Sequence, residues 1–235
     1  MTKTTTPSRA ATAATILLSV LTTAIRAPLL ARAGFADDEK FVTCGSAIKL
    51  THVESGKKFL LQSEERQLQT GSGQQLVTAA EDNRTPKGLW QVREGHNAED
   101  GMCETGVPIK CGSIVRLMHL ETGTNLHTHA IRSPLSNQHE VSCFGEGGVG
   151  DSGDDWTVVC DGVTRNRALY WVRGAPIQLR SVATGRWLGA SSSVQFSESN
   201  CGRGCPIMNH LEVFGRESND SYSRWTVELG VHLHK

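Results

Sequence analysis

One pattern recurs three times along this chain of 235 residues. Its first copy reads Cys44-Gly-Ser-Ala-Ile-Lys-Leu-Thr-His-Val-Glu-Ser-Gly56, and the second reads Cys111-Gly-Ser-Ile-Val-Arg-Leu-Met-His-Leu-Glu-Thr-Gly123. A more divergent third copy reads Gly174-Ala-Pro-Ile-Gln-Leu-Arg-Ser-Val-Ala-Thr-Gly185. Each copy places a glycine six residues after a leucine, at Leu50, Leu117 and Leu179. Such spaced self-similarity indicates units that share one core.

The three copies also close in the same way. Their last landmarks are Trp90-Gln-Val92, Trp156-Thr-Val158 and Trp225-Thr-Val227. Between the leucines and the tryptophans lie Gln75-Leu-Val77, His139-Glu-Val141 and Leu211-Glu-Val213. We therefore predict one domain over residues 38–229, made of repeats at 38–100, 103–160 and 162–229, with a tail at 230–235.

Each repeat has the local pattern of strands and tight turns. Ile48-Lys-Leu50, Val115-Arg-Leu117 and Ile177-Gln-Leu179 alternate apolar and polar residues with the period of a half-buried strand. The glycines that follow suit hairpin turns, because glycine accepts a positive φ without steric cost. Only the N-terminal region has helical character, so the domain is expected to be all-β.

One repeat cannot bury its apolar face alone, but three can close around a pseudo-threefold axis. This arrangement removes the exposed sheet edges and gathers the leucines, valines and tryptophans in one core. We therefore predict a β-trefoil, with the repeated tryptophans as core residues rather than stacking platforms. The alternative, a three-bladed propeller, is geometrically unfavourable because propellers typically use at least four blades.

The first 36 residues have the features of a secretory signal. Lys3 and Arg9 precede an apolar stretch over Ala10–Ile25, and cleavage is expected near residue 33 or 36. A mitochondrial transit peptide is the alternative, but Ile16–Leu21 is a compact apolar block rather than an amphipathic stripe. The C-terminal residues do not form a KDEL-type retention signal.

Charge and hydropathy exclude two classes of partner. Without residues 1–33 the chain has 20 basic and 24 acidic residues, so it does not attract the phosphate backbone of nucleic acids. No apolar run reaches the ~20 residues that span a bilayer, so no membrane insertion is expected after signal cleavage.

Several motifs resemble the MIR repeats of the stromal cell-derived factor 2 family. They include Phe41-Val-Thr-Cys-Gly-Ser46, Pro108-Ile-Lys-Cys-Gly112, Asn125-Leu-His127, Ser133-Pro-Leu-Ser-Asn137, Glu140-Val-Ser142, Asp154-Asp-Trp-Thr-Val158 and Tyr170-Trp-Val-Arg173. The resemblance covers about residues 38–229 and implies a β-trefoil of three MIR repeats. This sequence departs from the family in its Cys201-Gly-Arg-Gly-Cys205 segment and in lacking the retention tetrapeptide of some members.

The resemblance also implies a function. Members of this family are expected to act as non-catalytic adaptors, resembling co-chaperones, that assist protein folding and quality control in the endoplasmic reticulum. The implied partners are a luminal J-domain co-chaperone and, through it, the resident heat-shock chaperone. The expected location is the lumen of the endoplasmic reticulum or the secretory pathway, and secretion stays open without a retention signal.

The seven cysteines suit an oxidising compartment. Cys44 and Cys111 are equivalent by repeat, and Cys103 and Cys160 each follow a closing tryptophan. Equivalent positions predict the disulfides Cys44–Cys103 and Cys111–Cys160. A local Cys201–Cys205 pair would leave Cys143 free and buried beside Val141.

Two motifs resemble catalytic loops. Gly145-Glu-Gly-Gly-Val-Gly150 matches a dinucleotide-binding pattern, but the aspartates that follow it would repel phosphate. Gly150-Asp-Ser152-Gly-Asp154 resembles a serine-protease nucleophile loop, yet no histidine stands where a protease places its base. We predict no catalytic residue and no cofactor.

An acidic loop and a histidine pair contain side chains of the kinds that bind metals. The spacing of Asp151, Asp154 and Asp155 does not follow an EF-hand, which favours a solvated acidic loop over a calcium site. His127 and His129 lie on one face of a strand and would bind a metal only with a third ligand, so no metal site is predicted. Asn83 and Asn219 begin formal glycosylation sequons, the first weakened by Pro86.

A glycan-binding module is the alternative function, because a trefoil offers up to three similar pockets. Lectin-like trefoils present an acid and an aromatic residue in each pocket. Glu54 and Glu121 recur at equivalent positions, but Ala183 replaces them in the third repeat. A transferase would need a second domain, for which the chain has no room. The sequence assigns no ligand-binding residues.

Overall fold

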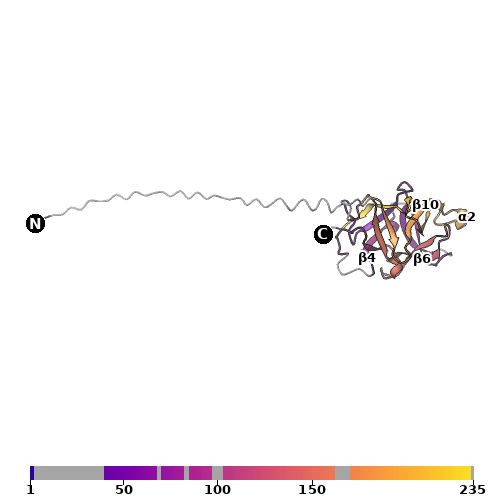
Figure 1. Ribbon diagram of the computed structural model, residues 1–235, viewed down its shortest axis with the longest axis horizontal. Coiled ribbons are helices and arrows are strands. Elements are labelled where there is room, and N and C mark those ends of the chain that lie inside the picture. Colours follow the sequence, from indigo (N-terminus) through magenta and orange to yellow (C-terminus); the bar gives the residue numbers. More distant parts are fainter. Residues whose placement is uncertain (3–39, 68–69, 82–84, 97–102, 162–169, 234–235) are drawn as a thin grey trace. The chain divides into compact units, whose positions relative to one another are not determined.

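The computed structural model describes residues 1–2, 40–67, 70–81, 85–96, 103–161 and 170–233. The predicted signal segment therefore falls almost wholly outside the described residues. The strands form three groups of four, which match the three repeats (Figure 1). The groups are β1 (Ala47–His52), β2 (Leu60–Gln67), β3 (Gln75–Ala80) and β4 (Trp90–Glu94); β5 (Ile114–His119), β6 (Asn125–Arg132), β7 (His139–Phe144) and β8 (Trp156–Cys160); and β9 (Ile177–Ser181), β10 (Trp187–Gln195), β11 (Leu211–Arg216) and β12 (Trp225–Val231).

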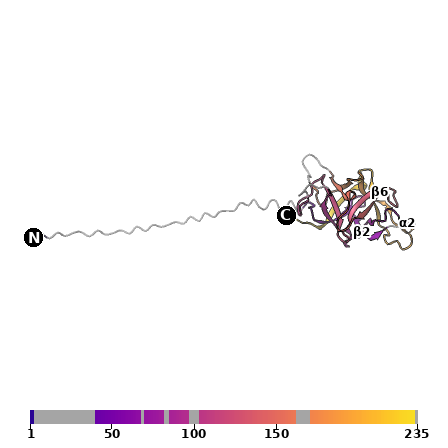
Figure 2. The same cartoon turned by 90° about the horizontal axis from the view of Figure 1, so that it is seen from below.

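The first and last strand of each repeat close into a barrel. Each of β1, β4, β5, β8, β9 and β12 pairs antiparallel with the next in that order, and β12 pairs back with β1. The two middle strands of each repeat form a hairpin. The hairpins meet in a triangle, in which β3 pairs with β7, β7 with β11, and β11 with β3. A six-stranded barrel capped by three hairpins is a β-trefoil, as the repeats predict, and Figure 2 gives a second view of it.

A ring of three backbone hydrogen bonds joins the segments that lead into the repeats. The amide of Val42 donates to the carbonyl of Trp171, Trp171 to Ile109, and Ile109 back to Val42, at 2.8, 2.8 and 2.9 Å. All three side chains are buried. They occupy equivalent positions, eight residues before Leu50, Leu117 and Leu179. The ring is therefore direct evidence of pseudo-threefold symmetry.

The repeated leucines and tryptophans make the core. Leu50, Leu117 and Leu179 are fully buried in one cluster, together with Trp90, Trp156 and Trp225. Each of these indoles donates a hydrogen bond to a backbone carbonyl of its own repeat, at Leu61, Leu126 and Leu188. The tryptophans are thus core residues, because both their apolar rings and their single donors are satisfied inside the domain.

The glycine turns between the first and second strand of each repeat follow the sequence prediction, but the helical content differs from it. Gly56, Gly123 and Gly185 adopt φ of 70°, 71° and 69°. Single 3-10 turns, unexpected from the sequence, precede each closing tryptophan: η2 (Pro86–Gly88), η3 (Ser152–Asp154) and η4 (Ser221–Ser223). A further short helix, α2 (Glu198–Cys201), lies between β10 and β11. Turns this short carry no helical periodicity, which is why the pattern of the sequence does not reveal them.

Three disulfides are present: Cys44–Cys103 and Cys111–Cys160, which the repeat comparison predicts, and the local pair Cys201–Cys205. Cys143 is a free, buried cysteine in the core beside Val141. Burial raises the pKa of its thiol to about 12, so this cysteine stays protonated at neutral pH. Within the described residues, no helix has the length and apolar character needed to cross a membrane.

Candidate functional site

The outer face of the β6–β7 hairpin brings together histidines, carboxylates and one aromatic ring. Asn125, His127 and His129 alternate along β6, so their side chains share a face. The loop that ends in η3 lies against this face and supplies Asp151 and Asp154. We call this group the repeat-2 face.

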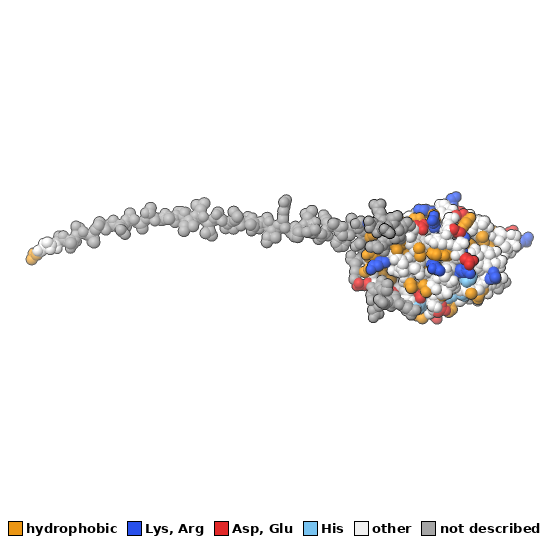
Figure 3. Space-filling model, viewed as in Figure 1, with side chains coloured by type: hydrophobic (Ala, Val, Ile, Leu, Met, Phe, Trp, Pro, Cys, Tyr) orange, Lys and Arg blue, Asp and Glu red, His pale blue; other side chains and the backbone are white. Residues whose placement is uncertain are grey.

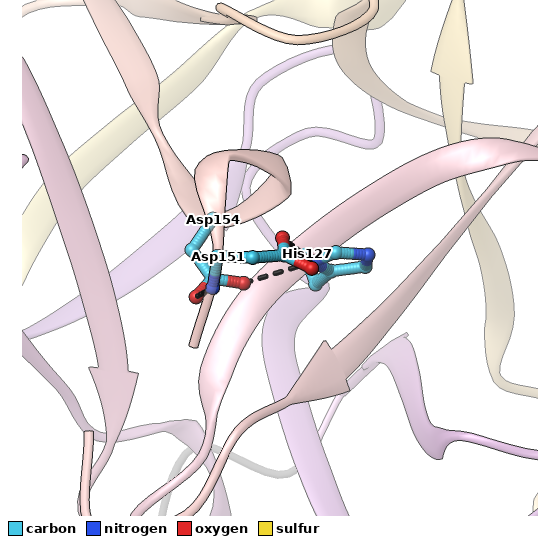
Figure 4. A group of neighbouring side chains, drawn as sticks. All are labelled: His127, Asp151 and Asp154. Carbon is cyan, nitrogen blue, oxygen red and sulfur yellow. Dashed lines mark hydrogen bonds and ion pairs between the residues drawn. The ribbon is translucent and has the colours of Figure 1, made fainter. Parts of the chain in front are cut away.

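The central contact is a hydrogen bond between His127 and a buried carboxylate. Nδ1 of His127 lies 2.8 Å from Oδ1 of Asp154 and 3.6 Å from Asp151 (Figure 4). The other oxygen of Asp154 accepts from the Asn125 amide and from the backbone N–H of Asp151, both at 3.0 Å. A carboxylate removed from water is stabilised when it accepts several hydrogen bonds of this kind.

The expectation of a solvated acidic loop is wrong for two of its three residues. Asp154 and Asp155 are buried, whereas Asp151 is exposed. The position two residues before each closing tryptophan faces inward in every repeat, since Gly88 and Ser223 are buried there too. The residues at these equivalent positions share no apolar character, so the sequence pattern gives no signal of the burial of Asp154.

A second histidine pair lies farther along the hairpin. Nε2 of His129 lies 2.8 Å from Oε2 of Glu140, which also accepts from the backbone N–H of Ser72 at 3.0 Å. Burial by itself would raise the pKa of Glu140, but the hydrogen bonds from His129 and Ser72 outweigh it and bring the pKa below its ordinary value. His96, in the segment after β4, donates its backbone N–H to Oδ1 of Asp155 at 3.0 Å. Its ring atom Nδ1 also lies 3.0 Å from the same oxygen.

His127 and His129 do not face a common site where both could bind one metal ion. Their rings are perpendicular, with centroids 5.1 Å apart, and His129 faces Glu140. Atoms of His127, Asp151 and Asp154 that could bind a metal ion do lie within 4.8 Å of one another. Both oxygens of Asp154 already accept hydrogen bonds, and a Cβ at Gly150 would lie only 1.9 Å from one of them. The arrangement is therefore that of a closed hydrogen-bonded network, which a metal would have to break.

One edge of the repeat-2 face is open to solvent. The Phe144 ring packs 5.1 Å from the His127 ring and keeps 36% of its surface exposed. The exposed carboxylate of Asp151 accepts the N–H of Gly153. The exposed Phe144 ring and the exposed Asp151 carboxylate thus both lie against the buried His127 imidazole, and together they form a surface that can stack against an apolar ring and accept hydrogen bonds from hydroxyl groups.

The remaining sequence candidates take structural positions. The glycine-rich loop Gly145–Gly150 forms a small turn closed by a bridge between Glu146 and Val149, and a single 3-10 turn follows it. Ser152 is exposed at the start of η3. Asn219 is exposed and accepts a hydrogen bond from Gln178, whereas Asn83 lies outside the described residues.

Comparison with known proteins agrees with this fold. Residues 40–202 match the family described as "MIR domain". Stromal cell-derived factor 2-like protein 1 of Mus musculus is 38% identical over 192 residues, which are 82% of this chain and 78% of the mouse protein. The solved structure of the SDF2-like protein from Arabidopsis thaliana has a TM-score of 0.72 and 30% identity, covering 83% of this chain and 98% of that one.

A larger protein carries the same domain. The structure of the S. cerevisiae protein O-mannosyltransferase Pmt1-Pmt2 complex bound to the sugar donor matches with a TM-score of 0.68 and 28% identity. The match covers 82% of this chain but only 26% of that one. The repeats, the trefoil and the similarity over about four fifths of the chain lead to one conclusion. The chain belongs to the MIR-domain proteins of the stromal cell-derived factor 2 family.

Proposed function

We propose that the protein is a non-catalytic adaptor of the secretory pathway that binds a luminal J-domain co-chaperone and, through it, the resident heat-shock chaperone. The observation that carries this proposal is similarity to stromal cell-derived factor 2 proteins along nearly the whole trefoil. These relatives and the mannosyltransferase neighbour fit a role associated with the endoplasmic reticulum. The disulfides fit the same oxidising compartment.

An adaptor needs an exposed surface on a rigid support. Adjoining loops of the second repeat expose Leu120, Phe144 and Val149, with 42%, 36% and 74% of their surfaces accessible. The loops are tied together by the N–H of Gly148, which donates to the carbonyl of Gly123 at 2.6 Å. We call these three side chains the repeat-2 apolar patch. On the face shown in Figure 3, charged and apolar side chains are interspersed.

The adaptor proposal is tested by capture from luminal extract, followed by binding of the purified co-chaperone. The tagged protein should retain a J-domain co-chaperone in mild salt, and the double variant F144S/V149S should reduce that binding at least tenfold. Val182, with 47% exposure, lies outside the patch, so Val182→Ser is the matched control and should bind normally. Absence of any chaperone or co-chaperone from the wild-type capture would refute the proposal.

Glycan binding is the second candidate, and the open edge of the repeat-2 face favours it. There an acid and an aromatic ring lie together, as in sugar pockets, although the acid is Asp151 rather than Glu54 or Glu121. Glu54 instead accepts a hydrogen bond from Ser192 at 3.4 Å, and Glu121 is exposed. On a glycan array, selective binding that Asp151→Asn and Phe144→Ala abolish would establish this function; an empty array would exclude it.

A further inference from the structure

The hairpin of the third repeat carries a segment that the other two hairpins lack. Residues 196–210 leave and rejoin the hairpin where the N–H of Phe196 donates to His210 and the N–H of Asn209 donates to Phe196, both at 2.9 Å. The segment contains α2 and the Cys201–Cys205 disulfide. Figures 1 and 2 place α2 at the end of the domain away from the C-terminus, where it projects from the body of the trefoil.

Apolar packing, rather than the disulfide alone, holds this segment in place. Phe196, Cys205 and Ile207 are buried against Leu76 in a cluster separate from the main core. Leu76 occupies the position that is Glu140 in the second repeat and Glu212 in the third. Those glutamates accept hydrogen bonds from backbone N–H groups of a neighbouring hairpin. At the equivalent position, Leu76 makes apolar contacts instead.

The three disulfides differ in what their opening would cost the fold. Cys201–Cys205 spans a sequence separation of 4, against 59 and 49 for the other two. By loop-closure entropy the short link therefore stabilises the fold much less than either long link. The apolar cluster under the segment stays available when the short link opens. The protein can therefore remain folded with Cys201 and Cys205 reduced.

The two sulfurs of this disulfide lie in different environments. Cys205 is 7% exposed within the apolar cluster, whereas Cys201 is partly exposed and lines a groove of about 330 Å³. The groove has an apolar base formed by Phe196 and Ile207, with Arg66 at its side. The nearest ion pair of Arg66 is a loose one, with Nε 3.9 Å from Glu64. Cys201 is therefore the sulfur that an incoming thiolate can reach, and the guanidinium of Arg66 places a positive charge beside the groove.

We propose that Cys201–Cys205 is an exchange-active disulfide whose substrates are peptide thiols with apolar neighbouring residues. The substrate thiolate attacks Sγ of Cys201, so that the Cys201–Cys205 bond breaks, a substrate–Cys201 disulfide forms, and the electron pair leaves on Cys205 as a thiolate. Attack by Cys205 on Cys201 returns the substrate thiolate. Attack by a second substrate thiolate on the first substrate sulfur instead releases an oxidised substrate and leaves the Cys201/Cys205 dithiol. Glutathione disulfide reoxidises that dithiol in two exchanges, which yield two molecules of reduced glutathione.

The proposal is tested on the purified, oxidised protein in glutathione buffers of increasing reduced fraction. After acid quenching and alkylation with N-ethylmaleimide, peptide mass spectrometry locates each modified sulfur. We expect glutathione on Cys201 and the alkyl group on Cys205 while Cys44–Cys103 and Cys111–Cys160 are still closed. A Cys201–Cys205 bond as resistant as the other two, or glutathione found on Cys205, would overturn the proposal.

Variants test the groove separately from the sulfur. Cys205→Ser treated with glutathione disulfide should hold glutathione on Cys201 as a stable mixed disulfide, with one molecule of reduced glutathione released. Arg66→Glu should slow attack by glutathione at least threefold, and Arg173→Glu, at an exposed arginine outside the groove, should not. A short cysteine peptide with leucine neighbours should react at least threefold faster than one with serine neighbours. Equal rates for the two peptides would refute the groove as the substrate site, and this wild-type measurement decides even if Cys205→Ser does not fold.

Discussion

Replacement of the repeated tryptophans by phenylalanine tests the pseudo-threefold core directly. In Trp90→Phe the indole N–H is lost, and the carbonyl of Leu61, which accepts it at 3.0 Å, is left without that donor inside the core. An orphaned buried acceptor costs about 1–3 kcal/mol. The smaller ring also leaves unfilled volume, which adds about 1 kcal/mol. The free energy of unfolding should therefore fall by about 2–4 kcal/mol.

The same change at Trp156 and Trp225 provides an internal comparison. Their indoles donate to Leu126 and Leu188 at 2.9 and 3.0 Å, and all three tryptophans are fully buried. The three variants should consequently lose stability by amounts that agree within about 1 kcal/mol, because the perturbed environments are equivalent. Urea denaturation followed by far-ultraviolet circular dichroism measures each loss.

Trp187 supplies the matched control. It is only partly buried, and its ring lies 5.5 Å from the Arg180 guanidinium rather than in the core. Trp187→Phe should cost less than about 1 kcal/mol, which is the scale of an exposed cation–π contact. A core variant that loses no more stability than this control would refute the assignment of that tryptophan to a shared, symmetric core.

Three further measurements follow from the structure. Burial lowers the pKa of His52 and His119 below 6.5, so as the pH falls the unfolded chain binds protons before the folded one does. The free energy of unfolding should be level between about pH 7 and pH 8 and fall as the pH drops below 6.5, and a flat profile down to pH 5 would contradict this. Leu76→Glu places a carboxylate in the apolar cluster and should cost at least 3 kcal/mol in urea denaturation, whereas a loss below 1 kcal/mol would show that the segment has other supports. Removal of Cys111–Cys160 by a double serine variant should cost about 2–5 kcal/mol, and a midpoint unchanged in urea would argue against its place in the fold.

The elements of the fold could be predicted because their signals are local and repeated. Leu50 and Trp90 stand in strand patterns that recur, and Gly56 marks a turn that requires positive φ. Three copies of a weak pattern are far more informative than one. The pairs Cys44–Cys103 and Cys111–Cys160 were predictable for the same reason, since equivalent cysteines make equivalent bonds.

The candidate site was less accessible from the sequence because its contacts are long-range. His127 and Asp154 are apart in sequence, and η3, a single turn, determines that Asp154 points inward. The aligned repeats show leucine at position 76 where the other two have Glu140 and Glu212. The contacts that each of these side chains makes depend on which hairpin lies against it. The aligned positions identify these residues; only the packing shows what they contact.

The pairing of β1 with β12 has a consequence for how the protein is made. A chain threaded into a compartment from its N-terminus delivers β1 first and β12 last, yet Leu50 of β1 lies opposite Val227 of β12 in the sheet. Contacts between residues so distant in sequence form slowly. Until the last strand arrives, the barrel cannot close between β1 and β12, and the apolar residues at that gap are open to aggregation. During synthesis the protein thus passes through a partly folded state with exposed apolar residues, the kind of state that folding factors bind in other proteins.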